Sequence, residues 1–418
     1  MAGFGSEGER RVEALRLVRE EGVPAAEAAR RVDRSRQWLM KWKRRAERGE
    51  GLLDQSRMSA TSFVALDERW AGLVAAYRQE LENDPVASIG GLSILAAMER
   101  AGLTGLPSVR SIERILTRGG MTRPAIKKAS RSTTPTLPLP RVPAVPGIWQ
   151  QTDWVQDRYL QGGIRFHSLQ ITDMGSAAGL ARQYPRRSVD NVVGYLVEHA
   201  WPVVSIPQAL SCDNAFSKTS HPNNPWTLFV RSCLFFGVEP VISPPYELGF
   251  TNGAENLNNL WQDRTIARRH YSTLGGLAGD TDRFNHWVNH QRPILDPTVT
   301  GTRYPAVLID RYHHQLRWPP EIFITDHQDR NGHLHIPLTT GRITFLRRVT
   351  NRAITIAHTT WPIDLPDHSL VVASITTADA TLTLRHHAQT IDTHPYPIHH
   401  PVTDPYHPPQ THSIYHHA

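Results

Sequence analysis

Three acidic residues in the middle of the chain have the types and the setting needed for metal chemistry. Asp153 lies within the strand-like stretch "WQQTDWV", and Asp213 directly follows a second one, "ALSC". Glu255 falls in the first turn of a helical pattern that runs through "NGAENLNNLWQD". Because a lone carboxylate is costly to bury beside apolar residues, we expect the three acids to meet where the strands end.

Carboxylate oxygens are the ligands that hard divalent cations prefer. Two such ions about 4 Å apart can activate an attacking oxygen and stabilise the leaving oxygen in a displacement at phosphorus. We therefore predict that Asp153, Asp213 and Glu255 are both catalytic and metal-binding, and that they hold Mg²⁺ (or Mn²⁺), two ions per active site.

The helix that carries Glu255 is otherwise rich in neutral amides. These would hydrogen-bond to DNA without repelling it, and the candidates are Asn258, Asn259 and Gln262. Other acids near the predicted site are alternatives as supporting groups, namely Asp157, Asp173 and Glu247.

The elements that would position these acids lie in a central block, residues 148–293. Three successive strand patterns come first, and helix and strand patterns then alternate up to the helix of Glu255. This order predicts an α/β core with a mixed sheet. No glycine-rich phosphate loop interrupts it.

Two helical regions precede the core. Residues 8–60 predict three short helices at helix-turn-helix spacing, with Ser35 as the cap of the last one. That helix is basic, and we expect it to contact DNA through Arg34, Arg36, Lys41, Lys43 and Arg44. Residues 64–123 predict a second helix-turn-helix or winged-helix-like domain. Its last helix is expected to start at Pro107-Ser108 and to stop at Gly119-Gly120, and it offers Arg110, Arg114 and Arg118. A solvated basic face and a plain helical spacer are the respective alternatives.

The segments around the core differ from it in composition. Residues 124–147 are rich in proline and basic, which predicts an extended linker. Residues 330–398 contain short alternating strands that predict a small β-barrel. The tail, residues 399–418, is rich in His and Pro and is expected to be disordered.

Composition limits the class of protein. The 418 residues exceed one ordinary core, and the formal net charge of +7 favours a polyanionic partner. Two cysteines cannot build a disulfide framework. No apolar run reaches the ~18 residues of a membrane span, so we expect a cytoplasmic, nucleoid-associated protein with no membrane partner.

Taken together, "WQQTDW", "CDNAF" and "GFTNGAENLN" resemble the motifs of bacterial insertion-sequence transposases that have a retroviral-integrase-like DDE catalytic core, the integrase core domain family. Asp213 follows Asp153 by 60 residues and Glu255 follows Asp213 by 42. The chain departs from the family pattern at Ala215, where glycine is frequent, and in the longer second interval.

The resemblance implies a multidomain protein with N-terminal all-α helix-turn-helix modules, a central RNase H-like core and a C-terminal small β-barrel. It also implies a polynucleotidyl transferase that cleaves double-stranded DNA at transposon ends and joins the 3′-hydroxyl to target DNA. The protein would act as a homo-oligomer on DNA, with or without a helper ATPase. The alternatives are a catalytically inert or domesticated transposase acting as a DNA-binding regulator, and a nuclease without strand transfer.

Overall fold

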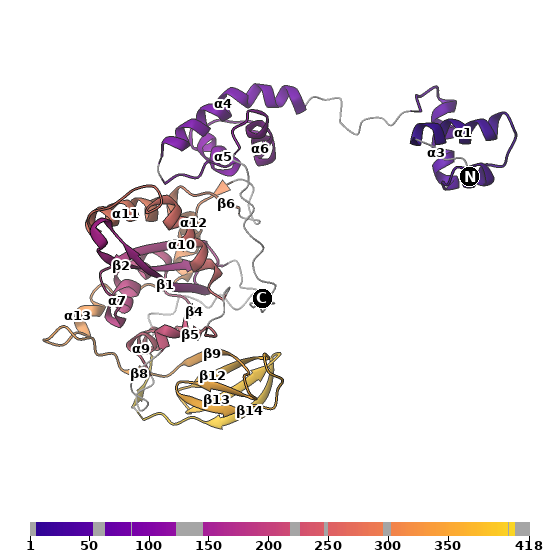
Figure 1. The fold of residues 1–418 in the computed structure, drawn as a ribbon. Helices are drawn as coiled ribbons and strands as arrows, with labels where there is room; N and C mark the ends of the chain where they lie inside the picture. Colours follow the sequence, from indigo (N-terminus) through magenta and orange to yellow (C-terminus); the bar gives the residue numbers. More distant parts are fainter. Residues whose placement is uncertain are drawn as a thin grey trace. The chain divides into compact units, whose positions relative to one another are not determined.

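The computed structural model describes residues 6–52, 63–84, 86–122, 145–217, 226–245, 250–295, 302–399 and 401–405. It divides into two compact units, Met1–Leu66 and Asp67–Ala418 (Figure 1). Nearly all of the predicted linker 124–147 and most of the tail 399–418 lie outside the described residues. Within the described part of the chain, no helix is both long and apolar enough to cross a membrane.

The first unit is a three-helix module, as the sequence predicts. Its helices are α1 (Glu7–Arg19), α2 (Ala25–Arg31) and α3 (Arg36–Glu47). Ser6 begins α1 with a capping box, and the Ser35 hydroxyl accepts a hydrogen bond from the backbone N–H of Trp38 at 3.2 Å. These caps satisfy amides that a helix cannot satisfy internally, and small apolar side chains such as Ala14, Ala28 and Leu39 fill the core.

The second unit begins with another group of three helices, α4 (Phe63–Asn83), α5 (Gly91–Arg100) and α6 (Val109–Arg118). Ser108 caps α6, and Gly120, at φ +66°, follows its end. A left-handed residue of this kind is easiest for glycine to adopt. The predicted helix start and stop are therefore confirmed.

A nine-stranded sheet follows, in the order β14-β13-β12-β9-β5-β4-β1-β2-β3. β1 pairs antiparallel with β2, and β2 with β3, whereas β1, β4 and β5 are parallel. The predicted mixed sheet is thus present. The strands of its core half are β1 (Trp149–Tyr159), β2 (Arg165–Asp173), β3 (Gly179–Tyr184), β4 (Ala209–Cys212) and β5 (Glu239–Ile242).

Helices cover both faces of this half of the sheet (Figure 1). Phe166 of β2 packs with α10 (Asn252–Arg264) and α11 (Leu274–His290). Leu169 and Ile171, on the opposite face of β2, pack with the helices that lie between β3 and β5. Those helices are α7 (Val189–Gly194), a π-helical segment (Tyr195–Ala200), α8 (Trp201–Val204) and α9 (Leu228–Phe235).

The small β-barrel expected over residues 330–398 is not confirmed. Its main strands are β9 (Arg342–Arg348), β12 (Leu370–Thr376), β13 (Thr381–His386) and β14 (Gln389–Pro395). They pair antiparallel in series, and β9 also pairs in parallel with the core strand β5. Because β9 pairs with the edge of β5, the strands β9, β12, β13 and β14 extend the core sheet. Among the described residues, β14 does not pair with β9, a pairing that would close a barrel.

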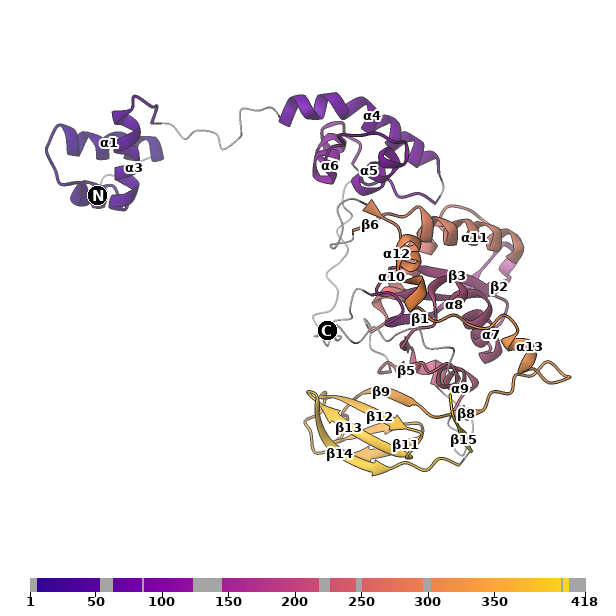
Figure 2. The same cartoon turned by 180° about the vertical axis from the view of Figure 1, so that it is seen from behind.

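Shorter elements complete the second unit (Figure 2). The hairpin strands β10 and β11 span Ala353–Ile356 and Thr359–Pro362, and the two-residue strands are Ile294–Leu295 (β6), Thr302–Arg303 (β7), Leu338–Thr339 (β8) and Val402–Thr403 (β15). The remaining helical turns are Gln161–Gly163, Asn214–Ser217, His313–Gln315, α12 (Pro305–Tyr312) and α13 (Phe323–Asp326).

Candidate functional site

The three predicted acids lie on neighbouring elements: Asp153 is inside β1, Asp213 follows β4, and Glu255 is in the first turn of α10. The parallel register sets Gln151 of β1 opposite Ser211 of β4. Asp153 and Asp213 each lie two residues beyond this pair, so both acids lie at the same end of the paired segment of β1 and β4. Glu255 lies in the first turn of α10, which packs against β1 and β2. Asp153 is half-buried in β1, whereas Asp213 is exposed in the turn after β4.

The carboxylates act on one another electrostatically. The pKa of Asp153 is raised to about 7, first by burial, then by the charge of Asp213 and, more weakly, by that of Glu255. The backbone N–H of Trp154 and the guanidinium of Arg187 oppose this shift. A charge disfavours ionisation of a like-charged group only when the two are close. The fold therefore brings Asp213 and Glu255 close enough to Asp153 to act on its pKa.

The carboxylates do not converge on a single point, however. Among the residues described, no group of three or more His, Cys, Asp and Glu side chains is close enough to hold a metal ion. The two observations are compatible, because Coulomb repulsion acts over several ångströms whereas a cation–oxygen bond is about 2.0–2.6 Å long.

Sequence reasoning missed the residue that connects β1 to the helix of Glu255. The amide group of Gln151 donates to the carbonyl of Phe250 at 3.0 Å and accepts from the N–H of Gly253 at 2.7 Å. A Cβ on Gly253 would lie 2.4 Å from the sulfur of Met174 and 2.8 Å from Oε1 of Gln151. Gln151 therefore holds the start of α10 against β1. Its signal in the sequence is a glutamine two residues before Asp153, on the same face of the strand.

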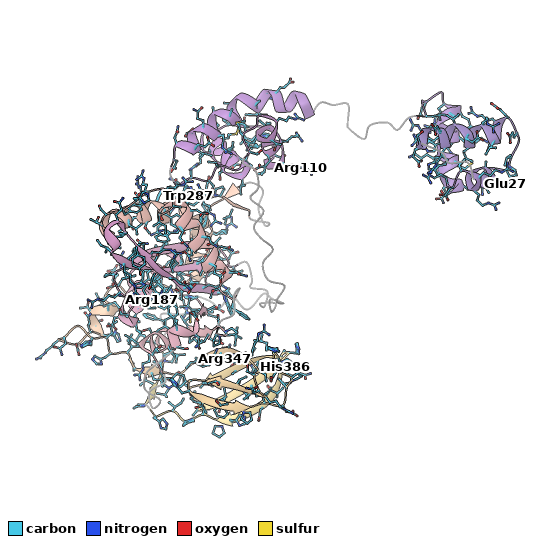
Figure 3. All side chains as sticks on the ribbon, viewed as in Figure 1. Glu27, Arg110, Arg187, Trp287, Arg347 and His386 are labelled. Atoms are coloured by element: carbon cyan, nitrogen blue, oxygen red, sulfur yellow. The ribbon has the colours of Figure 1, made fainter. Side chains whose placement is uncertain are left out.

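A second missed residue lies in the C-terminal part of the sheet. Arg347 of β9 is buried, and burial lowers the pKa of its guanidinium to about 10. Arg347, labelled in Figure 3, donates from Nη2 to Oδ1 of Asn214, the residue after Asp213, at 2.7 Å. Further donations go to backbone carbonyls of Ser243, Leu346 and Thr355. The turn that carries Asp213 is thus held by a strand more than 130 residues away in the chain.

Two of the three acids considered as supporting groups, Asp157 and Asp173, have partners of their own. Asp157 forms an ion pair with Arg165 at 2.8 Å, beside His167, and Arg187 donates to Nδ1 of His167 at 3.1 Å. Asp173 is buried and accepts three hydrogen bonds, from the backbone N–H of Gly147 and from the N–H and hydroxyl of Ser176. Glu247 lies outside the described residues.

The predicted amides of α10 are partly engaged with other side chains. Gln262 accepts two hydrogen bonds from the guanidinium of Arg158, at 3.0 and 2.6 Å, and donates to Asn258 at 2.6 Å. Asn259 is exposed. Only a rearrangement of the Arg158 contact would free the Gln262 carbonyl for a ligand.

The basic residues predicted to contact DNA fall into two groups. Exposed side chains form the first group, consisting of Arg36, Lys41, Arg44, Arg110 and Arg118. The others are half-buried: Arg34 pairs with Glu7 of α1, Lys43 lies 3.9 Å from Glu47, and Arg114 donates to Ser111 at 3.4 Å. The Arg34–Glu7 pair connects α3 to α1, which gives Arg34 a role within the module.

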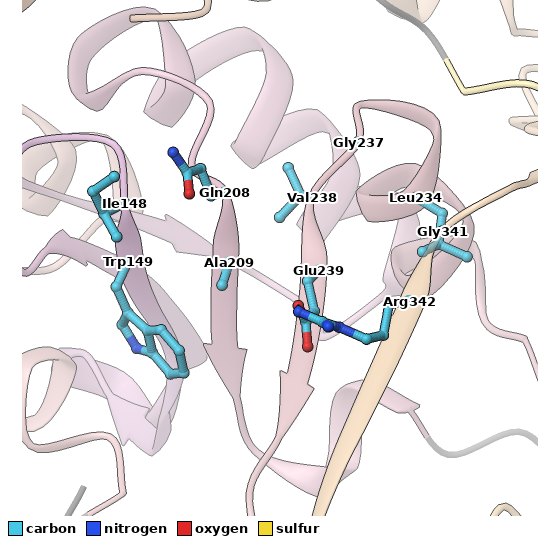
Figure 4. A pocket seen from close by; sticks show the side chains of 10 residues that line it. All are labelled: Ile148, Trp149, Gln208, Ala209, Leu234, Gly237, Val238, Glu239, Gly341 and Arg342. Carbon is cyan, nitrogen blue, oxygen red and sulfur yellow. The ribbon is translucent and has the colours of Figure 1, made fainter. Parts of the chain in front are cut away.

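A pocket of about 460 Å³ lies at the opposite ends of the strands from the acids. The amino ends of β1, β4, β5 and β9 form it, and Arg342 pairs with Glu239 across it at 2.5 Å (Figure 4). None of the predicted site residues lines this pocket. Its size therefore gives no reason to move the candidate site away from the carboxylates.

Residues 7–54 match the family model of a homeodomain-like domain. That match covers α1, α2 and α3, where the sequence predicts a helix-turn-helix. The search of curated proteins found no match.

Several solved structures are distantly similar. A simian T-cell lymphotropic virus intasome in complex with PP2A regulatory subunit B56 gamma is 14% identical, covering 71% of this chain and 93% of that one, with a TM-score of 0.35. The HTLV-2 integrase catalytic core domain with magnesium, in a dimeric form, is 13% identical, covering 38% of this chain and 94% of that one, with a TM-score of 0.28. At these TM-scores the likeness carries no conclusion about this chain.

Proposed function

We propose that this protein is a DDE-type DNA transposase or integrase, which cleaves DNA at the ends of a mobile element and joins the 3′-hydroxyl to target DNA. The observation that carries the proposal is the position of Asp153 and Asp213 at the same end of the parallel pair β1 and β4, against which the helix of Glu255 packs. The raised pKa of Asp153 agrees with it. Strongly perturbed carboxylates that interact across several elements are typical of functional sites.

The donor set fits a hard divalent cation. Its ligands would be the carboxylate oxygens of Asp153, Asp213 and Glu255, and a positive charge among them would relieve the repulsion that raises the pKa of Asp153. Bound Mg²⁺ or Mn²⁺ would supply activation of the attacking oxygen and charge stabilisation of the leaving oxygen.

The chain's own residues prepare this site. Gln151 holds the first turn of α10, and with it Glu255, against the strand of Asp153. Arg347 holds the turn of Asp213 through Asn214. Asp153 must lose its proton before it can act as a ligand, and the nearby charge of Arg187 favours the ionised form. Attack by water and then by a 3′-hydroxyl needs no protein nucleophile, so no serine or tyrosine is assigned.

The homeodomain-like module supports DNA as the partner, because the helix that reads the major groove in such modules is the last one. In this chain that helix is α3, on which Arg36, Lys41 and Arg44 are exposed. The exposed Arg110 and Arg118 of α6 would add phosphate contacts. We infer that the chain binds element ends through these helices and acts as an oligomer on paired ends.

The test uses the full-length protein and labelled duplexes taken from the DNA that flanks its gene. With Mg²⁺, the wild type should nick the duplex at one position and join it to a second duplex. Asp153→Asn, Asp213→Asn and Glu255→Gln should each abolish both products while binding the duplex normally. Full activity in any of the three variants would remove that residue from the site.

One observation favours the second candidate, an inert DNA-binding regulator. Among the described residues, the three carboxylates lie too far apart to hold a metal ion together. The same assay separates the candidates: a regulator would bind the flanking duplex tightly in all four proteins and produce no cleavage in any of them.

A further inference from the structure

Gln170 in β2 is a fully buried side chain whose amide has no hydrogen-bond partner. Its exposed fraction is 0%, and neither its Oε1 nor its Nε2 meets a partner among the described residues. Burying an amide without partners destabilises the folded state. A group of this kind calls for an explanation.

The other buried glutamines of this part of the sheet are engaged. Both ends of the Gln151 amide bond to the start of α10. The Gln150 amide donates to the carbonyls of Val204 and Ser205, and the Gln183 amide donates to the hydroxyl of Ser168 at 3.3 Å. Oε1 of Gln150 also has no partner among the described residues, so Gln170 is the one of these four glutamines whose amide has neither atom paired.

The position of Gln170 links it to the candidate site. The antiparallel register pairs Gln170 directly with Asp153. Side chains of directly opposed residues lie on the same face, with Cβ atoms about 4.5–5.5 Å apart. Gln151, two residues before Asp153, reaches α10 from that face, so Asp153 and Gln170 lie side by side beneath the helix that carries Glu255.

We propose that Gln170 is a positioning residue of the catalytic site, and that its amide N–H donates to the Asp153 carboxylate when this carboxylate turns toward Asp213 and Glu255. The inference rests on the proposed function. An amide donor stabilises the ionised carboxylate and fixes its rotamer. The Gln170 amide has no partner while the three carboxylates are apart, because the Asp153 carboxylate comes within hydrogen-bonding distance only when they converge.

The test replaces Gln170 with Met, which has a similar length and no amide. Without metal, the full-length variant should unfold at a higher temperature than the wild type, because the unpartnered amide is gone. With Mg²⁺, kcat for end cleavage should fall about 10- to 100-fold, the loss expected for one hydrogen bond to a charged group, while KM for DNA stays unchanged. The Mg²⁺ concentration that gives half of the maximal thermal stabilisation should rise.

Gln183→Met is the matched control, because it removes a buried glutamine amide from the same face of β3. This variant loses the Ser168 hydrogen bond, so its unfolding temperature should fall while kcat and the Mg²⁺ response stay at wild-type values. Gln170→Leu, a smaller apolar side chain, serves if the methionine variant does not fold.

The outcomes separate the two proposals. If the wild type cleaves and Gln170→Met cleaves equally well with the same Mg²⁺ response, the role of Gln170 is refuted and the function stands. If the wild type does not cleave, the proposed function fails, and an unchanged Mg²⁺ stabilisation in Gln170→Met would refute the positioning role as well. A variant that loses activity only in proportion to lost stability would also overturn the inference, because it would assign Gln170 a structural role.

Discussion

Neutralising Asp153 should stabilise the metal-free protein while removing its activity. The carboxyl of Asp153 has an ordinary pKa of 3.8 and a folded-state pKa of about 7, raised first by burial and then by the charges of Asp213 and Glu255. Below about pH 4 the group is protonated in both the folded and the unfolded chain. Between pH 4 and 7 only the unfolded chain ionises, so the free energy of unfolding falls as pH rises and levels off above about pH 7.

The size of the effect follows from the shift. At about 1.4 kcal/mol per pH unit, the rise from 3.8 to about 7 corresponds to roughly 4 kcal/mol. Asp153 is half-buried, so solvent screening reduces this figure, and we expect on the order of 2–4 kcal/mol. For a domain of this size that energy moves the midpoint of thermal unfolding by roughly 5–15 °C.

The assay compares thermal unfolding of the wild type and Asp153→Asn at pH 4, 6 and 8, with EDTA present and tryptophan fluorescence as the signal. The unfolding temperature of the variant should exceed that of the wild type by an amount that increases with pH, and most of this increase should be complete by pH 7. Asp263→Asn, which changes an exposed acid of α10, should follow the wild type at every pH. Parallel curves of unfolding temperature against pH for the wild type and Asp153→Asn would refute the reasoning, because they would mean that folding does not raise the pKa of Asp153.

Further predictions concern the cation, the start of α10 and the DNA-binding helices. Saturating Mg²⁺ at pH 8, at about 100 times its dissociation constant, should stabilise the wild type by about 2.7 kcal/mol and leave Asp153→Asn unchanged in a thermal shift assay; equal shifts would place the ion elsewhere. Gly253→Ala should destabilise the protein by about 1–3 kcal/mol in urea unfolding and lower cleavage, because a Cβ has no room there; wild-type stability would contradict the close packing. Arg36→Ala should reduce the slope of log affinity for DNA against log salt by about one unit, whereas Arg34→Ala should mainly lower the unfolding temperature, since Arg34 pairs with Glu7; the reverse pattern would exchange their roles. A chain lacking residues 1–123, mixed with full-length Asp153→Asn on paired ends, should recover cleavage if subunits cut in trans, and no recovery would favour action in cis.

Local patterns determined the elements and the identity of the candidate residues. Ser35 and Ser108 begin helices where the sequence predicts them, because a cap acts through neighbouring amides. The mixed sheet follows from three strand patterns and the alternation of helix and strand after them. The types and order of Asp153, Asp213 and Glu255 are also sequence properties, and they gave the hypothesis of a carboxylate site before any coordinates.

Tertiary structure decided what depends on contacts between distant segments. The contact between Gln151 and Gly253, separated by 102 residues, positions Glu255, and no periodic pattern encodes it. The β-barrel expected near the C-terminus is not confirmed, and its strands also join the core sheet, because β9 pairs with β5. Local alternation reports that a segment is a strand, but not which partner its backbone groups find. Likewise, the interaction of Asp153 with its two acidic neighbours arises only when separate elements come together, since electrostatic energy depends on distance in space.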